Sequence, residues 1–198
     1  PAGSFDSLHA ALNAGCDIIY FGVSEFNMRA RGAKNFKLKD IPEIVSLCKK
    51  HKVETNLTLN TILFNNELQK MREIVDVAKK ESLDAIIASD MATISYARKN
   101  NVPVYISTQL SISNTESLKI YSQFADRVVI ARELRLEQIK MISEDIKKQK
   151  IKGPSGKLVE LEVFIHGALC VAVSGRCGMS LYCHDESANR GKCLHMCR

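Results

Sequence analysis

The sequence lacks the features that would place it in a membrane, on a secretory route or among disordered chains. No apolar run approaches the roughly 18 residues that a membrane helix needs, and no segment resembles a signal peptide. It has only 4 prolines and no low-complexity tract, while 45% of its residues are hydrophobic and 25% are charged. This composition is typical of a globular protein. We therefore expect a cytoplasmic protein with no membrane partner.

A dinucleotide-binding fingerprint is also missing, because no G-x-G-x-x-G follows any predicted strand. Short apolar segments instead alternate with amphipathic ones. Helices are predicted between Ser4 and Gly15 and at 40–51, 67–80, 92–100, 114–124 and 136–148. Strands are predicted at 16–22, 53–60, 84–90, 102–108, 127–131 and 158–167. Connections this short require parallel strands joined by crossover helices.

This alternation favours an α/β fold of the parallel (β/α) TIM-barrel type, incomplete at both ends of the chain. Six strands are predicted, and the chain opens in the loop before a helix. We expect residues 1–167 to form the barrel portion. Residues 168–198, called here the cysteine-rich segment, are expected to bind a cofactor within the same domain.

Polar residues follow the predicted strands at corresponding positions. In a barrel of this type the chemistry lies at the carboxyl ends of the strands. A single polar residue there is more simply explained as a cap of the next helix. Several together favour a pocket: they are Asn60, Asp90, Gln109, Glu133 and His166.

Seven cysteines without an export signal favour thiolates over disulfides, because the cytosol keeps thiols reduced. Five of them lie between Leu161 and the end of the chain: Cys170, Cys177, Cys183, Cys193 and Cys197. Six residues separate the first two, and fifteen separate Cys177 from Cys193. These intervals are wider than the knuckles of structural zinc sites. Iron–sulfur clusters tolerate looser spacing, so the pattern favours such a cluster over zinc.

Two further features support weaker interpretations. The net charge of +6 favours binding of polyanions such as RNA. Much of this excess, however, lies in the lysines at 147–152, which could equally belong to a solvated helix end. A protease could use Ser174 or Cys170 as nucleophile with His166 as base. The sequence lacks the G-x-S-x-G elbow, however, and places no orienting acid.

Several blocks of the sequence together resemble one known family. EVFIHGALCVAVSGRCGMS, followed by ANRGKC and CR, resembles the signature of the collagenase-like proteases, peptidase family thirty-two of unassigned catalytic type. PAGSFDSLHAALNAGCDIIYFG resembles the family's N-terminal block, and STQLSISN and VVIARELRLEQI resemble its middle blocks. The similarity covers essentially the whole chain.

The resemblance implies a barrel-like catalytic domain with a [4Fe–4S] cluster. Better-understood members support oxygen-independent hydroxylation of a wobble uridine in tRNA (with prephenate as a required metabolite), of a ribosomal RNA cytidine and of the ubiquinone ring. Cys170, Cys177 and Cys193 match the cluster-ligand positions. The fourth ligand lies beyond Arg198 or is Cys197, and Cys183 departs from the family pattern.

We therefore expect an iron–sulfur enzyme that hydroxylates tRNA wobble uridine to 5-hydroxyuridine, with tRNA and not DNA as its partner. The alternatives are a collagenase-like peptidase and a non-catalytic accessory subunit that works with a paired homologous subunit. The residues expected to be catalytic are His166, Glu133, Gln109 and Asp90. Those expected to bind substrate are Asn60 and the arginines that would contact phosphate or a carboxylate, Arg29, Arg31 and Arg176.

Overall fold

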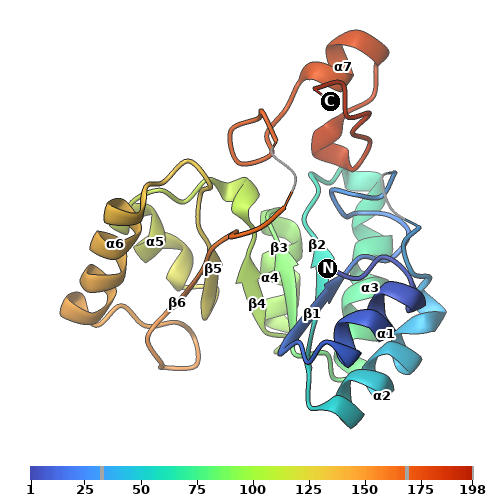
Figure 1. Ribbon diagram of the computed structural model, residues 1–198, viewed down its shortest axis with the longest axis horizontal. Coiled ribbons are helices and arrows are strands. Elements are labelled where there is room, and N and C mark those ends of the chain that lie inside the picture. Colours follow the sequence, from blue (N-terminus) through green and yellow to red (C-terminus); the bar gives the residue numbers. More distant parts are fainter. Residues whose placement is uncertain (32–33, 168–169, 198) are drawn as a thin grey trace.

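Six short strands form one parallel sheet in the computed structural model, which describes residues 1–31, 34–167 and 170–197. Each strand pairs with the next in chain order: β1 (Ile18–Phe21), β2 (Glu54–Leu59), β3 (Ala85–Ala88), β4 (Val104–Ile106), β5 (Arg127–Val129) and β6 (Glu160–Glu162). A doubly wound dinucleotide fold reverses its strand order partway along the sheet, whereas a barrel wall does not. The sheet curls into a half-barrel (Figure 1), which confirms the predicted α/β barrel class.

Helices join successive strands and cover the outside of the curl (Figure 1). Their apolar faces are buried in the same hydrophobic core as the strands, where Met71 and Val75 of α3 join the fully buried Leu57 and Ile86. None of the helices in the described residues is long and apolar enough to cross a membrane. The helices are α1 (Phe5–Asn13), α2 (Ile41–His51), α3 (Leu68–Lys80), α4 (Met91–Lys99), α5 (Thr115–Ser122), α6 (Leu136–Gln149) and α7 (Met179–His184).

The sheet face turned away from the helices carries charged side chains. Arg127 of β5 pairs with Glu54 of β2 at 3.0 Å and with Glu160 of β6 at 2.9 Å. Its guanidinium also lies over the Tyr105 ring, 4.4 Å from the centroid. Because the Arg127 side chain is only 14% exposed, these partners offset the cost of burying its charge. The pairing with Glu54 joins two strands that are not neighbours, as the inward curl of the sheet allows.

Three of the helices, α1, α4 and α5, begin at a residue whose side chain accepts a backbone N–H of the first turn. Ser4, at the predicted start of the first helix, caps α1, because its Oγ accepts the Ser7 N–H while the Ser7 Oγ accepts the Ser4 N–H. Asp40 lies at the N-cap position of α2, where the predicted helix begins, but its side chain makes no capping hydrogen bond to that helix. Its carboxylate instead accepts the Lys37 N–H at 2.7 Å, because a short 3₁₀ turn, Leu38–Asp40, precedes the helix.

The last strand is much shorter than predicted. The sequence suggested a strand over 158–167, but β6 ends at Glu162, where the Ile130 N–H donates to the Glu162 carbonyl at 3.1 Å. Beyond that point β5 offers no strand to pair with, and β propensity alone does not hold a strand. Phe164 and Ile165 are consequently 50% and 94% exposed. His166 therefore lies in an exposed bend rather than at a strand end.

The packing of the sheet against the helices predicts a clear stability difference between two isoleucines. Ile86 is fully buried on β3, whereas Ile120 on α5 is 59% exposed. Ile86→Ala should lower the free energy of unfolding by about 2–5 kcal/mol, because it leaves a cavity in the core. Ile120→Ala, the matched control, should change it by less than about 0.5 kcal/mol. Urea denaturation followed by circular dichroism measures both, and equal effects would contradict this account of the core.

Candidate functional site

Side chains at the carboxyl ends of β2 and β4 form one hydrogen-bond network. The Asn60 amide nitrogen donates to Ser107 Oγ and to Gln109 Oε1, both at 3.2 Å. Ser107 Oγ donates to the same Oε1. Asn60 Oδ1 accepts the Met28 N–H at 3.0 Å, so Asn60 also anchors the loop that follows β1. Two of the predicted pocket residues, Asn60 and Gln109, are thus in direct contact.

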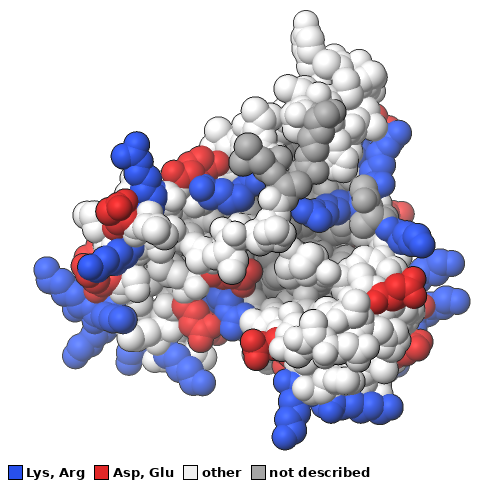
Figure 2. All heavy atoms as spheres, viewed as in Figure 1, with Lys and Arg blue, Asp and Glu red and all other residues white. Residues whose placement is uncertain are grey.

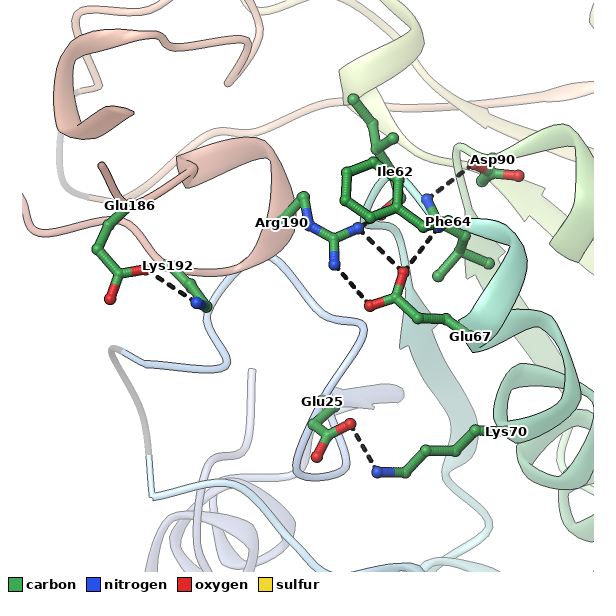
Figure 3. Close-up of polar contacts among 10 residues, drawn as sticks. Glu25, Ile62, Phe64, Glu67, Lys70, Asp90, Glu186, Arg190 and Lys192 are labelled. Atoms are coloured by element: carbon green, nitrogen blue, oxygen red, sulfur yellow. Dashed lines mark hydrogen bonds and ion pairs between the residues drawn. The ribbon is translucent and has the colours of Figure 1, made fainter. Parts of the chain in front are cut away.

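Asp90, at the end of β3, is fully engaged in shaping the same edge. Its Oδ1 accepts the Ala92 N–H at 2.8 Å and caps α4. Its Oδ2 accepts the Leu63 N–H at 3.1 Å and holds the loop after β2 (Figure 3). The capping interpretation of this residue, one of the two left open by the sequence, therefore accounts for both carboxylate oxygens.

Glu133, which follows β5, binds the cysteine-rich segment. Its two carboxylate oxygens accept the Ser174 N–H at 2.5 Å and the Ser174 Oγ–H at 2.7 Å. Burial by itself raises the pKa of Glu133, but the hydrogen bonds from Ser174 and the charge of Arg132 outweigh it, so the pKa lies below its usual value. Glu133 is therefore ionised and holds Ser174, which is fully buried.

Arg176 makes the second contact between this part of the segment and the sheet edge. Its Nε donates to the Gln109 carbonyl at 2.7 Å. Its guanidinium is exposed and pairs with no carboxylate in the parts of the chain that the structure describes. The predicted substrate-binding residue Arg176 thus lies on the same rim as Gln109 and Glu133, with its charge free to meet an anion.

The tripeptide Asn189–Arg190–Gly191 docks the other half of the segment. The Asn189 side chain accepts the Cys177 N–H and donates to the Cys177 carbonyl, both at 3.2 Å, so it fixes the backbone at that cysteine. The Asn189 carbonyl accepts the Ile62 N–H at 3.1 Å. One residue therefore connects a cysteine of the motif to the loop after β2.

Arg190 makes the densest contact in this region (Figure 3). Its two terminal nitrogens pair with the Glu67 carboxylate at 3.0 and 2.5 Å, and one also donates to the Ile62 carbonyl at 3.0 Å. The guanidinium lies 3.7 Å above the centre of the Phe64 ring. Hydrogen bonds from Arg190 lower the pKa of Glu67. A bidentate salt bridge of this kind fixes the relative orientation of the two side chains as well as the distance between them.

Gly191 is required by a close approach to the loop after β1. Its φ is +81°, and an added Cβ would lie 2.4 Å from the Asn27 carbonyl oxygen. Its own carbonyl accepts the Arg31 N–H at 3.1 Å. The side chain of Arg31 pairs with Glu186 at 3.0 Å, which Lys192 also contacts at 3.0 Å. Arg31, predicted to bind substrate, therefore has a structural partner.

The five cysteines of the cysteine-rich segment fall into two groups by exposure. Cys170, Cys177 and Cys193 are half-buried, whereas Cys183 and Cys197 are exposed. Backbone N–H groups two residues further on donate to the sulfurs of Cys177 and Cys193, each at 3.4 Å. Such N–H···S bonds stabilise thiolates that ligate metal centres. Among the described residues, no three His, Cys, Asp or Glu side chains converge on one metal ion.

His166 and Arg29 lie apart from these networks. His166 is exposed, and no hydrogen bond joins it to another side chain in the described parts of the structure. The Arg29 side chain is also exposed, and within the described residues Arg29 is hydrogen-bonded through its backbone alone, to the side chains of Asn27 and Asn35. The structure therefore brings Asn60, Gln109, Glu133 and Arg176 to one edge, but leaves these two on the surface.

Several residues of the site were not predicted from the sequence. They are Ser107, Asn189, Arg190 and Glu67, the partner of Arg190. The NRGKC motif gave a signal for Asn189 and Arg190, because it adjoins a predicted ligand. Nothing local marked Glu67, which lies 123 positions from Arg190.

A parallel half-barrel whose carboxyl-end rim carries a docked cysteine-rich segment matches one known class of protein. The model of peptidase family U32 matches residues 3–198, and the chain belongs to this family. A solved structure described as the U32 peptidase Mk0906 has a similar fold, with a TM-score of 0.63 and 15% identity over 82% of this chain and 65% of that one.

Three curated relatives align over the whole chain. A collagenase of Porphyromonas gingivalis is 49% identical, with 48% of its length covered. The tRNA hydroxylation protein P1 of Bacillus subtilis is 32% identical, with 45% covered. The 23S rRNA 5-hydroxycytidine C2501 synthase of Escherichia coli is 33% identical, with 28% covered. The chain thus spans about half or less of the length of these relatives.

The Glu67–Arg190 pair predicts how firmly the cysteine-rich segment is docked. Glu67→Gln removes the charge but keeps the shape, and should ease local opening at the Ile62 and Gly191 amides by about 1–3 kcal/mol. Glu25→Gln is the control, because it breaks the exposed Lys70–Glu25 pair and should cost less than about 1 kcal/mol (Figure 3). Native-state hydrogen exchange measures both variants.

The same pair predicts the direction of its pH dependence. Because the pKa of Glu67 is lowered in the folded state, its contribution is fully present above the unfolded value of about 4.3. It is lost as the pH falls through the lowered folded value. Wild-type amides should therefore open more readily in acid, while those of Glu67→Gln should change less. Identical pH profiles would contradict the role of this pair.

Proposed function

We propose that the protein acts in oxygen-independent hydroxylation of RNA, most directly of tRNA wobble uridine to 5-hydroxyuridine. The observation that carries this proposal is the similarity over the full chain to relatives named for tRNA and rRNA hydroxylation, at 32% and 33% identity. Because the chain spans less than half of those two relatives, the activity is proposed for the whole protein of which such a chain would form part.

We further propose that Cys170, Cys177 and Cys193 hold a [4Fe–4S] cluster, with zinc as the less favoured alternative. The donor set suits this group, because all three thiols are half-buried and the sulfurs of Cys177 and Cys193 accept N–H···S bonds of the kind that cluster ligands make. When bound, a cluster would supply electron transfer. The exposed Cys197 and a residue outside this chain remain the two alternatives for the fourth ligand.

The chain's own residues would position the segment and the substrate. Asn189 orients the backbone of Cys177, and Glu133 holds Ser174 against the sheet edge. Asn60, Gln109 and Asp90 would shape the floor beneath, and Arg176 would meet phosphate or carboxylate groups. Of the other two predicted arginines, Arg31 is paired with Glu186 and Arg29 lies on the surface apart from this edge. His166 is exposed at the surface, and no hydrogen bond to another described side chain sets its orientation.

The partner proposed for the whole protein is tRNA in the cytoplasm, with a paired homologous subunit and prephenate as further expectations. The net charge of +6 is compatible with a polyanionic partner. Basic side chains lie below the cysteine-rich segment as well as around the periphery of the molecule (Figure 2).

A peptidase is the second candidate, favoured by the 49% identity to a relative named collagenase. Its simplest mechanism would use Ser174 as nucleophile and His166 as base. Ser174 is fully buried and its hydroxyl hydrogen is committed to Glu133. The burial and the hydrogen bond to Glu133 weigh against Ser174 as a nucleophile. Cys170 is then the remaining candidate nucleophile for a peptidase.

The cluster proposal predicts distinct outcomes for the cysteines. Serine replacement of Cys170, Cys177 or Cys193 should abolish iron and acid-labile sulfide in anaerobically purified full-length protein, because a thiolate ligand is lost. Cys183→Ser, the matched control in the same segment, should retain both, and Cys197→Ser decides between the two candidates for the fourth ligand. Absorbance spectra with iron and sulfide analysis provide the measurement. A colourless, iron-free wild-type protein with peptidase activity would contradict the cluster proposal.

The RNA proposal predicts a change in the modified nucleosides of tRNA. A strain that lacks the gene should lose bases derived from 5-hydroxyuridine, and the wild-type gene should restore them. Cys177→Ser should fail to restore them, whereas Cys183→Ser should succeed. Nucleoside mass spectrometry of purified tRNA measures the effect, and unchanged tRNA in the deletion strain would count against this substrate.

A further inference from the structure

Arg132 lies at the same rim with its charge unmatched. It follows β5 and is half-buried, and its Nε is fully buried without a hydrogen-bond partner among the described residues. Its one hydrogen bond there is a long one, 3.5 Å from Nη2 to the Ala172 carbonyl, and it takes part in no ion pair of the described chain. A guanidinium in this setting is costly unless an anion meets it.

The carboxylate of Glu133, the next residue in the chain, is not the anion that pairs with Arg132. Glu133 is next to Arg132 in the chain, and the charge of Arg132 contributes to its lowered pKa. Both Glu133 oxygens, however, accept hydrogen bonds from Ser174. The carboxylate is thus directed at Ser174, and the fork of Arg132 remains available to another acceptor.

Gln109 turns a second donor towards the same space. Its Oε1 accepts from both Asn60 and Ser107, so the hydrogen-bond network sets the orientation of its amide. Nε2 must then point the other way, towards Gly175. It donates to no partner in the part of the chain that the structure describes.

Gly175 leaves a gap between these donors. A Cβ built on it would lie 3.5 Å from Gln109 Nε2 and 4.0 Å from Arg132 Nη2. Its φ of +87° also favours glycine. A side chain here would occupy the space that both donors face. The glycine therefore leaves both donors unobstructed by a side chain at this position.

We propose that Arg132 and Gln109 bind an oxyanion, a carboxylate or phosphate group of a small-molecule ligand, beside Gly175. Arg132 would supply the charge and the planar fork that match such a group, and Gln109 would supply a positioned neutral donor. Arg176, whose Nε is fixed on the Gln109 carbonyl, adds a second positive charge at the mouth. The site lies against the cysteine-rich segment, because Gly175 and the Ala172 carbonyl both belong to that segment.

The test measures thermal stabilisation of the anaerobically purified full-length protein by inorganic phosphate or malonate at constant ionic strength. Bound anion raises the unfolding temperature with its concentration. These salts also stabilise any protein by exclusion from its surface, so the difference between variants is what counts. Wild type should show a saturable increase, and whichever of phosphate and malonate binds more tightly identifies the group.

Arg132→Gln should weaken the apparent affinity by about tenfold or more, because it removes a charged hydrogen-bond donor. Gln109→Glu should do the same, since it keeps the bonds from Asn60 and Ser107 but turns an oxygen towards the anion. Arg98→Gln on α4 is the matched control and should behave as wild type. Circular dichroism confirms that each variant folds.

Three results would overturn the site. The first is that the unfolding temperature of wild type shows no saturable increase with either anion. The second is that Arg132→Gln is stabilised by the anions as strongly as wild type. The third is that Arg132→Gln weakens binding of a uridine oligonucleotide but not binding of the small anions. The last would assign Arg132 to an RNA phosphate instead. Binding is measured without turnover, so failure of this site and failure of the hydroxylation proposal give separate results.

Discussion

The bidentate salt bridge between Arg190 and Glu67 is the contact on which the arrangement of the cysteine-rich segment depends. This segment has almost no core of its own: its large apolar side chains, such as Val171 and Tyr182, are exposed by 67% and 93%. Burial of apolar surface therefore cannot hold it on the barrel. Directional polar contacts do so, and Arg190 provides the strongest, with a carboxylate, a carbonyl and an aromatic ring as partners.

This mode of attachment links the position of the cysteines to the loops of the barrel. Asn189 fixes Cys177, Gly191 lies against the loop after β1, and Glu133 holds Ser174. The motif glycines and polar residues between the cysteines are therefore docking residues. Because the contacts come from the loops after β1, β2 and β5, only a sheet already curled can present them together.

Part of this could be predicted from the sequence, and the reasons for the rest are physical. Helical and strand periods located the elements, and Ser4 carried a legible capping signal. The strand predicted over 158–167 was too long, because Phe164 and Ile165 have strand propensity but no neighbouring strand to pair with. Asn60 and Gln109 were correctly placed on one rim. Their orientation could not be predicted, because it depends on Ser107 and on the exact register of β2 and β4.

The sequence by itself determined the order of strands and helices, the parallel sheet, and the set of thiols and rim residues available for chemistry, because periodicity and residue type are local properties. The tertiary structure alone decided which of these meet. It matched Glu67 with Arg190 across 123 positions, committed Asp90 to capping, placed His166 in an exposed bend and left Arg132 facing Gly175. Such pairings depend on how the curled sheet brings its loops together, which no local pattern encodes.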